Sequence, residues 1–440
     1  VVDAFRTEGA DAWYNSPPER FLGPDRDADA YEQVFDIVDV WFESGSTHAF
    51  VLGRPGLTFP ADLYLEGSDQ HRGWFQSSLL ESVGTRGIAP FRALVTNGFV
   101  LDEHGRKMSK SLGNVIAPQD VNDTMGADVL RLWVMNSDTN DDLRIGKEIL
   151  KQQGELYRRL RNTLRWLLGG LDGFTQAEAV PYAELPELER WVLHRLTELG
   201  GLVARAVETH EWVGVYPALH GFCTTDLSAF YFDIRKDALY CDAPSSPTRR
   251  AVRTVLDILH RCLTTWLAPV LVFTAEESWT ARFGTEDSVH EQAFVDMPLE
   301  WMDPELEERW TRIRAVRRVI TTEIEGARRS GAIGSSLQAN VELTLSQEEA
   351  ALFAGVNWSE LAIVSHGEVV IDPTSASVYV EGDEGGLLHG APVVHVAEGE
   401  KCVRCWKVLP ETGSRADRPG LCLRCADVVT GMEAATPEGA

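Results

Sequence analysis

Four cysteines near the carboxyl end place the strongest restriction on how this 440-residue chain can fold. They form two Cys-x2-Cys pairs, "CVRC" and "CLRC", at Cys402, Cys405, Cys422 and Cys425. Two pairs at this separation can place four thiolates around one tetrahedral zinc ion, with Zn–S distances of about 2.3 Å. Since four sulfur ligands leave no position open for water or substrate, we expect one structural zinc in a ribbon. Two unrelated pairs or a redox couple are the alternatives.

The other three cysteines, Cys223, Cys241 and Cys262, are scattered through apolar sequence, which favours reduced, buried thiols over a disulfide framework. This usage indicates a reducing, cytoplasmic compartment. No apolar run approaches the roughly 18 to 20 residues that a membrane span requires, so we expect no membrane partner. The first residues, "VVDAFRTEG", contain neither an initiator methionine nor a secretory signal, and we expect the chain to begin inside a longer gene product.

The chain is strongly acidic, with a formal net charge of −26. Such a charge repels phosphate backbones at long range and argues against loose, charge-driven binding to nucleic acid. Any RNA contact must therefore come from local basic stretches. The sequence has three, at residues 151–165, 309–329 and 401–424. Solvated helix faces are the alternative interpretation of the first two.

The apolar pattern divides the chain into α/β and helical parts. Strand-like runs at 62–67 and 91–101 alternate with helical patterns at 70–83 and 126–135, which suggests a doubly wound α/β layer. From about residue 146 apolar residues recur at helical spacing, which predicts a bundle, and one more long amphipathic helix is expected over 301–330. The strand-like runs that follow are "ANVELTL" (339–345), "LAIVSH" (361–366), "VVID" (369–372), "SVYV" (377–380) and "PVVHV" (392–396).

The stretch "GRKMSKSLGN" (105–114) carries Lys107 and Lys110 on a short loop bounded by Gly105 and Gly113. When ATP is attacked at its α-phosphorus, negative charge moves onto the departing pyrophosphate. Two ammonium groups that reach it only in the transition state lower the barrier without tightening the ground state, and flanking glycines let such a loop open and close. Lys107 and Lys110 are therefore candidate catalytic residues. A solvated turn is the alternative.

A third group of polar residues lies in "YLEGSDQHRGWF", after the first predicted strand. Glu66 falls at the carboxyl end of that strand, where α/β sheets bind ligands. Glu66 could accept a hydrogen bond from an ammonium group or a ribose hydroxyl, and Gln70 on the following loop could bind a nucleotide. Taken singly, each of these residues is more often a helix cap or a surface residue.

These segments together resemble one family. "GRKMSKSLGN" resembles the second signature of the class I aminoacyl-tRNA synthetases. "DVWFESGSTHAF" (39–50) and "DLYLEGSDQHRGWF" (62–75) resemble two active-site segments of the bacterial isoleucyl-tRNA synthetases. "DLSAFYFDIRKDALYCD" (226–242) is similar to their anticodon-binding helical domain, and the four-cysteine tail is similar to their zinc-bearing carboxyl terminus. The resemblance covers about residues 10 to 428.

The resemblance implies a multidomain fold, α/β with an all-α part. The expected parts are a connecting segment at the end of an editing insertion (1–40), the carboxyl-terminal half of a Rossmann-like catalytic domain (41–145), an anticodon-binding helical bundle (146–300), a small α/β junction module (301–395) and a zinc-ribbon tail (396–440).

It also implies an ATP-dependent ligase that forms isoleucyl-adenylate and transfers the acyl group to tRNA(Ile), with Mg²⁺ accompanying ATP. By this similarity Lys110 binds ATP and Glu66 contacts the aminoacyl-adenylate. Asp69, Gln70, Trp41 and Trp74 match pocket-lining positions, and the four tail cysteines match the zinc ligands. The complete enzyme is expected to act as a monomer.

The sequence departs from the family pattern in several places. The first signature, H-x-G-H, and the large editing insertion are not found, so the 440 residues alone are expected to be inactive. Asn97 stands where histidine is expected and Glu43 where aspartate is expected, although both keep a hydrogen-bonding group. Two other functions are consistent with the sequence. A non-catalytic RNA-binding protein would have no use for the lysine loop, and a valine or leucine ligase would share that loop but not the "YLEGSDQHRGW" segment.

Overall fold

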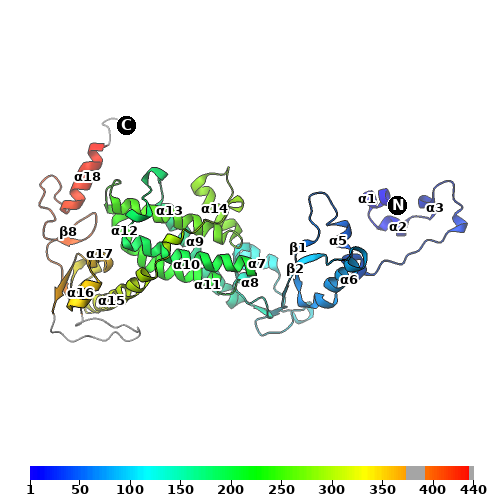
Figure 1. Cartoon of the computed structure of the whole chain (residues 1–440), viewed down its shortest axis with the longest axis horizontal. Coiled ribbons are helices and arrows are strands. Elements are labelled where there is room, and N and C mark those ends of the chain that lie inside the picture. The colour runs from blue at the N-terminus through cyan, green and yellow to red at the C-terminus, as the bar shows by residue number, and fades with distance from the viewer. Residues whose placement is uncertain (373–391, 436–440) are drawn as a thin grey trace. The chain divides into compact units, whose positions relative to one another are not determined.

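The computed structural model describes residues 1–372 and 392–435 (Figure 1). It contains two compact units: Val1–Leu101 with Thr139–Leu143, and Asp102–Asp138 with the chain from Arg144 onward. Each unit is described by itself. The predicted strand "SVYV" (377–380) lies outside the described residues.

The first unit is built around a β–α–β motif. Strands β1 (Ala61–Gly67) and β2 (Phe91–Asn97) pair in parallel, with Leu63 opposite Ala93. Because parallel strands cannot be joined by a tight turn, helix α6 (Trp74–Arg86) forms the crossover between them. The strand and helix alternation expected from the sequence is therefore confirmed.

The second predicted strand, 91–101, is interrupted in the structure. It divides at Gly98 into β2 and β3 (Val100–Asp102). A Cβ atom at Gly98 would lie 2.3 Å from the Asp141 carbonyl oxygen, so only glycine permits this approach of two backbones. The other helices of this unit are α1 (Val2–Glu8), α2 (Asp11–Asn15), α3 (Glu19–Leu22), α4 (Val40–Gly45) and α5 (Thr47–Phe50).

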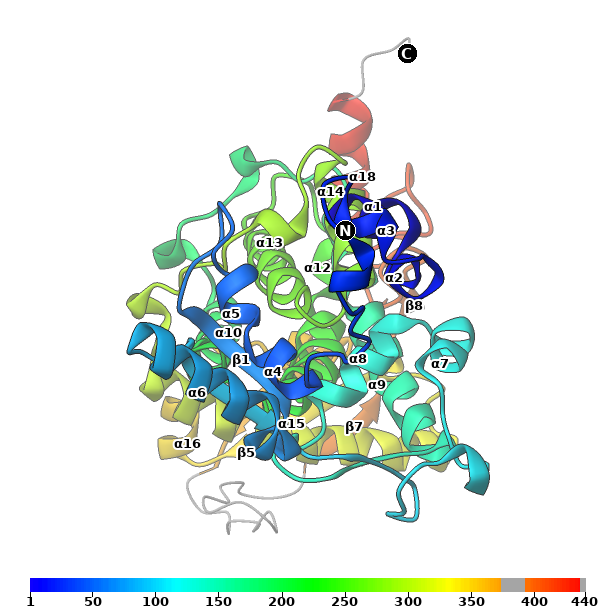
Figure 2. The same cartoon turned by 90° about the vertical axis from the view of Figure 1, so that its right-hand side faces the viewer.

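The second unit is a helical bundle followed by a small sheet and the cysteine-bearing tail (Figures 1 and 2). Apolar side chains such as Trp191, Leu196 and Leu259 are fully buried in the bundle, which confirms the helical period seen in the sequence. None of the helices within residues 1–372 and 392–435 has both the length and the apolar composition needed to cross a membrane. The elements of this part are α7 (Pro118–Met125), α8 (Ala127–Met135), β4 (Leu143–Ile145), α9 (Lys147–Gly170), α10 (Glu187–Thr209), α11 (Val215–Gly221), a π-helix (Phe222–Tyr231), α12 (Phe232–Cys241), α13 (Pro247–Leu267), α14 (Val272–Phe283) and α15 (Pro304–Arg329).

The small sheet has the order β6–β5–β7. Its central strand β5 (Ala339–Leu345) alternates buried and half-buried residues, as a strand with one covered face should. Strand β6 (His366–Ile371) pairs with β5 in parallel and β7 (Val393–Val396) pairs with it antiparallel. Helices α16 (Gln347–Leu352) and α17 (Trp358–Leu361) lie between β5 and β6 in the chain.

The predicted strand "LAIVSH" is wrong. Leu361 ends α17, and Ile363 has a φ of 55°, in the left-handed region that β-branched residues rarely adopt. The strand starts only at His366. The tail then forms β8 (Glu400–Lys401), β9 (Val408–Leu409) and helix α18 (Leu423–Ala435).

A buried ion pair connects the bundle with the sheet module. Arg235 on α12 donates from Nε and Nη2 to the two carboxylate oxygens of Glu189 on α10, each at 2.7 Å, and it also pairs with Glu360 on α17. The Tyr231 hydroxyl donates to Glu189 at 3.2 Å. Burial alone would lower the pKa of Arg235, but the Glu189 carboxylate outweighs burial and raises it. The Arg235 guanidinium is thus charged and buried, and its carboxylate partners compensate the energetic cost of burying that charge.

Replacing Glu189 with alanine should destabilise the chain by about 3–5 kcal/mol, because it removes the buried carboxylate that pairs with Arg235 and leaves that charge with the partly exposed Glu360. The matched control is Glu155→Ala, which breaks the exposed pair with Arg158 and should cost less than about 1 kcal/mol. Urea unfolding followed by tryptophan fluorescence measures both. Equal losses for the two variants would show that the buried pair has no special role.

Candidate active site and metal centre

The lysine loop connects the end of β3 with α7 and belongs to the second unit. Lys107 and Lys110 are both exposed. Neither ammonium group has an ion-pair partner in the part of the chain that the structure describes. Gly105 and Gly113 have φ values of 77° and 64°, so both positions require the left-handed conformation that glycine adopts without strain. The loop therefore presents two free positive charges between two glycine turns.

Hydroxyl groups organise the centre of this loop. Ser109 Oγ accepts from the Leu112 backbone N–H at 3.3 Å and caps a short 3-10 turn, Lys110–Leu112. Ser111 Oγ lies 3.1 Å from Ser109 Oγ. Two flanking residues that the sequence did not bring to notice, Asp102 and Asn114, hydrogen-bond to each other at 2.9 Å. These hydrogen bonds give the backbone of the loop a defined conformation, and the two ammonium groups extend from it toward solvent.

The segment that contains Glu66 lies in the first unit, at the carboxyl end of β1. Glu66 and Asp69 are exposed, and Asp69 accepts a weak bond of 3.4 Å from the Gln70 amide. The Gln70 side-chain oxygen accepts from the Trp74 backbone N–H at 3.1 Å at the start of α6. The Gln70 side-chain oxygen is therefore occupied by the first backbone N–H of α6, while the Glu66 carboxylate is exposed and open to a ligand.

Two tryptophans stand beside this segment. The Trp74 ring stacks on Tyr64, with ring centroids 4.2 Å apart, and its indole N–H donates to the Ser44 carbonyl at 2.9 Å. Trp41 on α4 lies against Gly73, where an added Cβ atom would come within 2.7 Å of the indole ring. The structure thus brings Trp41, Gln70 and Trp74 together around Gly73, on the segment that follows the β1 residue Glu66 in the chain. The lysine loop and this segment belong to different units.

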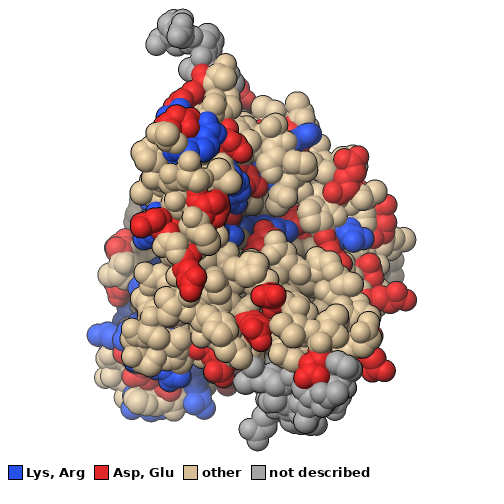
Figure 3. Space-filling model, turned by 90° about the vertical axis from the view of Figure 1, so that its left-hand side faces the viewer, with Lys and Arg blue, Asp and Glu red and all other residues tan. Residues whose placement is uncertain are grey.

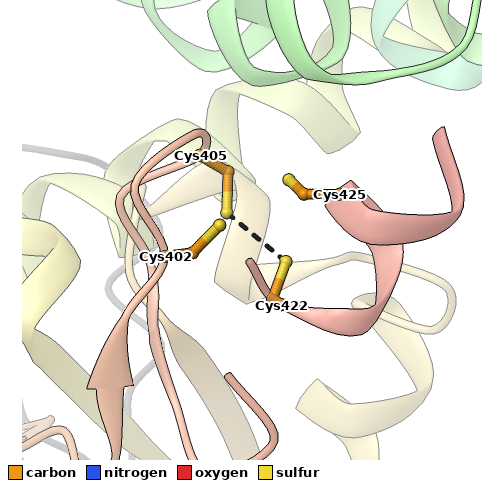
Figure 4. A group of neighbouring side chains, drawn as sticks. All are labelled: Cys402, Cys405, Cys422 and Cys425. Atoms are coloured by element: carbon orange, nitrogen blue, oxygen red, sulfur yellow. Dashed lines mark hydrogen bonds between the residues drawn. The ribbon is translucent and has the colours of Figure 1, made fainter. Parts of the chain in front are cut away.

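The four tail cysteines converge on one point (Figure 4). Their Sγ atoms all lie within 4.8 Å of one another, and Cys405 Sγ is 3.8 Å from Cys422 Sγ. A tetrahedron with Zn–S bonds of about 2.3 Å has sulfur–sulfur edges of about 3.8 Å, so this cluster fits one zinc ion. All four residues are buried. The predicted zinc site is confirmed as a closed, structural one.

The surroundings shift the pKa values of the four thiols in different directions: the pKa of Cys402 falls, whereas those of Cys405, Cys422 and Cys425 rise. Burial tends to raise the pKa of Cys402, but backbone N–H groups of Cys405, Cys422 and Arg404 outweigh it and lower the pKa to about 6. Metal ligation requires the deprotonated sulfur, so zinc binding at this cluster would release protons from the thiols. Cys241 on α12, expected only as a core thiol, packs against the four ligands and donates to the Arg404 carbonyl at 3.7 Å.

A cavity of about 390 Å³ lies between α12, α17 and the first cysteine knuckle. Tyr240 and Trp406 both line it, and they are 63% and 60% exposed, so two aromatic faces are available to a partner. Trp406 has a φ of 66°, which is unusual for a bulky residue, and the Lys401 ammonium lies 5.5 Å from the centre of its ring. Strained backbone of this kind is concentrated at binding sites.

Most cations of the three basic stretches are neutralised inside the molecule. Arg161 pairs with Glu277 at 3.1 Å, Arg314 with Asp226 at 2.9 Å and Arg424 with Asp237 at 2.6 Å. On the face seen in Figure 3, acidic and basic side chains are interspersed. Within residues 1–372 and 392–435, the cations of these stretches that make neither an ion pair nor a hydrogen bond are Arg159, Arg165, Arg329, Lys401 and Lys407.

The purified chain should contain about one zinc per molecule, because the four thiolates form a closed tetrahedral set. Cys422→Ser should reduce the zinc content strongly, whereas Cys262→Ala, which removes a buried thiol of α13, should leave it unchanged. Elemental analysis after gentle purification measures this. A wild-type chain without zinc would exclude the metal site.

Comparison with known proteins places these segments in one family. The family model "tRNA synthetases class I (I, L, M and V)" matches residues 1–146. "Anticodon-binding domain of tRNA ligase" matches residues 189–343, and "Zinc finger found in FPG and IleRS" matches residues 399–428.

Curated relatives agree with these matches. The chain is 70% identical over 430 residues to an isoleucine–tRNA ligase of Gluconobacter oxydans, 52% identical over 432 residues to one of Ruegeria pomeroyi and 50% identical over 438 residues to one of Brucella abortus. These alignments cover 98%, 97% and 99% of this chain, which spans 44% of the length of each relative. The chain belongs to the isoleucine–tRNA ligase family of the class I tRNA synthetases.

Proposed function

We propose that this chain supplies the lysine loop, part of the amino-acid site and the tRNA-binding part of an isoleucine–tRNA ligase. The observation that carries the proposal is the pair of exposed ammonium groups on the glycine-bounded loop, which have no ion-pair partner within residues 1–372 and 392–435. In adenylate formation the isoleucine carboxylate attacks the α-phosphorus of ATP and pyrophosphate leaves. Lys107 and Lys110 neutralise the charge that develops on this leaving group, and Lys110 holds ATP. Mg²⁺ bound with ATP would share that charge.

The first unit supplies the amino-acid side of the reaction in this proposal. The open carboxylate of Glu66 suits the ammonium group of the aminoacyl-adenylate, and Asp69 adds a second negative charge nearby. Trp41 and Trp74 offer apolar walls for a branched aliphatic side chain. Gln70 contributes by accepting a hydrogen bond from the Trp74 backbone N–H and so holding Trp74 in place. This division of roles follows from which polar atoms are already occupied and which are open.

We propose tRNA(Ile) as the macromolecular partner, bound by the bundle and the ribbon in the cytoplasm, with the complete ligase acting as a monomer. Because most arginines of the basic stretches are paired within the protein, charge attraction to the phosphate backbone of the RNA supplies little of the binding affinity. The exposed aromatic rings of Tyr240 and Trp406, with Lys401 and Lys407 beside them, offer stacking to an unpaired base. In this proposal, stacking of an unpaired base on these rings supplies the affinity for RNA that the negative net charge of the protein does not.

The ligase function is tested by grafting this chain into the Gluconobacter oxydans enzyme in place of the matching segment, with which it shares 70% identity. The hybrid should catalyse isoleucine-dependent ATP–pyrophosphate exchange, and Lys110→Ala should reduce the rate by about 10²-fold because a transition-state contact is lost. Exchange that responds to valine or leucine equally well would assign a different substrate. A hybrid unaffected by Lys110→Ala would exclude the role given to the lysine loop.

The RNA-binding role is tested separately with the 440-residue chain and tRNA(Ile) transcripts. Trp406→Ala should weaken binding by about 10-fold, as expected for the loss of one stacked base. Tyr14→Ala, which removes another exposed ring in the first unit, is the control and should have no effect. Filter binding or fluorescence anisotropy at fixed salt measures the dissociation constants. Equal affinity of the wild type and Trp406→Ala would remove the stacking site from the proposal.

A further inference from the structure

We propose that Asp102 and Asn114 are positioning residues that close the base of the lysine loop and aim Lys107 and Lys110. The inference rests on the proposed function, since it concerns how the same loop acts. It goes further by assigning roles to two residues outside the lysines and hydroxyls of the motif. The hydrogen bonds of both residues and the burial of Asp102 carry the argument.

Asp102 closes the first end of the loop. Its Oδ1 accepts from the backbone N–H groups of His104 at 3.0 Å and Arg106 at 2.8 Å, and its Oδ2 accepts from Arg106 Nε at 2.8 Å. The backbone of Asp102 also pairs with that of Arg106, with an N···O distance of 2.9 Å. The Asp102 side chain is only 7% exposed, although it lies on a surface loop. A carboxylate with this many donors is held as the charged form and cannot rotate freely.

Asn114 joins the second end of the loop to the first. Its Nδ2 donates to Asp102 Oδ2 at 2.9 Å and to the Lys107 carbonyl at 3.2 Å, and its Oδ1 accepts from the Ser109 N–H at 3.0 Å. These contacts lie on both sides of Met108, so one amide fixes the direction of the backbone between the two lysines. The side-chain amide provides the two donor hydrogens and the acceptor oxygen that this arrangement uses, whereas a hydroxyl group has only one donor hydrogen.

The consequence is a loop with a fixed base and free charges. The carboxylate of Asp102 is occupied by Arg106, Asn114 and backbone groups, so it is not available to neutralise either lysine. The glycine turns at Gly105 and Gly113 can change conformation while the Asp102–Asn114 bond keeps the ends together. The loop can then approach pyrophosphate as one piece, with both ammonium groups arriving in a set geometry.

The structural part of the proposal is tested by tryptic cleavage after Lys107 and Lys110 in the 440-residue chain. Asn114→Asp places a second carboxylate against Asp102 and removes two donors, so cleavage should be about 10-fold faster. The exchanged pair Asp102→Asn with Asn114→Asp restores one donor–acceptor bond and should return part of the protection, a coupling that independent sites would not show. Asn162→Asp, on the exposed side of α9, controls for the added charge. Unchanged cleavage in Asn114→Asp would overturn the proposal.

The catalytic part is tested in the hybrid ligase with Asn114→Ala. The value of kcat for ATP–pyrophosphate exchange should fall about 10–100-fold, while KM for ATP should change by less than about 3-fold. The reason is that both lysine ammonium groups are still present but are no longer held in the direction of the leaving group. A change confined to KM, or none at all, would overturn the positioning role. If Lys110→Ala itself has no effect, the proposed function fails, whereas failure of Asn114→Ala alone removes only the inference about Asp102 and Asn114.

Discussion

Helix α12 is the element on which the rest of the second unit depends. Its Arg235 side chain forms the buried pair with Glu189 and reaches Glu360 in the sheet module. At its other end, Arg404 of the first cysteine knuckle donates to the Tyr240 carbonyl at 3.2 Å, and Arg424 binds Asp237 through two hydrogen bonds. Bundle, sheet module and ribbon are therefore connected through charged side chains on one helix. The buried Arg235–Glu189 pair is costly to break, whereas the ribbon that carries Trp406 is oriented by the partly exposed Arg424–Asp237 pair and by the Arg404 hydrogen bond to Tyr240.

The paired arginines and the two lysines of the loop have different roles in this protein. Arginines in the helices and ribbon are mostly paired internally, where they fix structure. Among the residues that the structure describes, Lys107 and Lys110 have no ion-pair partner, although the chain carries a net charge of −26. A compact ammonium on a flexible stem suits a group that must move toward a phosphate, whereas a forked guanidinium suits a fixed pair. The zinc ion has a purely structural role by comparison, since its four sulfur ligands leave no open position.

Local patterns predicted the elements that depend on local physics. The alternation in 339–345 gave β5 with its stated bounds, and the cysteine spacing gave the metal cluster. Three features escaped prediction because they depend on how side chains meet in space: the ten-residue π-helix Phe222–Tyr231, the left-handed Ile363 inside a predicted strand, and the closure of the lysine loop by Asn114. A hydrophobic period cannot distinguish a π-helix from an α-helix. It also cannot show which groups the side-chain amide of Asn114 will hydrogen-bond to.

The central claim is that the lysine pair binds the departing pyrophosphate in the transition state much more strongly than it binds ATP in the ground state. Single-turnover formation of isoleucyl-adenylate by the hybrid ligase, measured by rapid quench across a range of ATP concentrations, separates these two effects. With Lys110→Ala the rate constant at saturating ATP should fall by about 10²-fold, while the dissociation constant for ATP changes by less than about 3-fold. A loss confined to ATP affinity, with an unchanged rate constant at saturation, would contradict the claim.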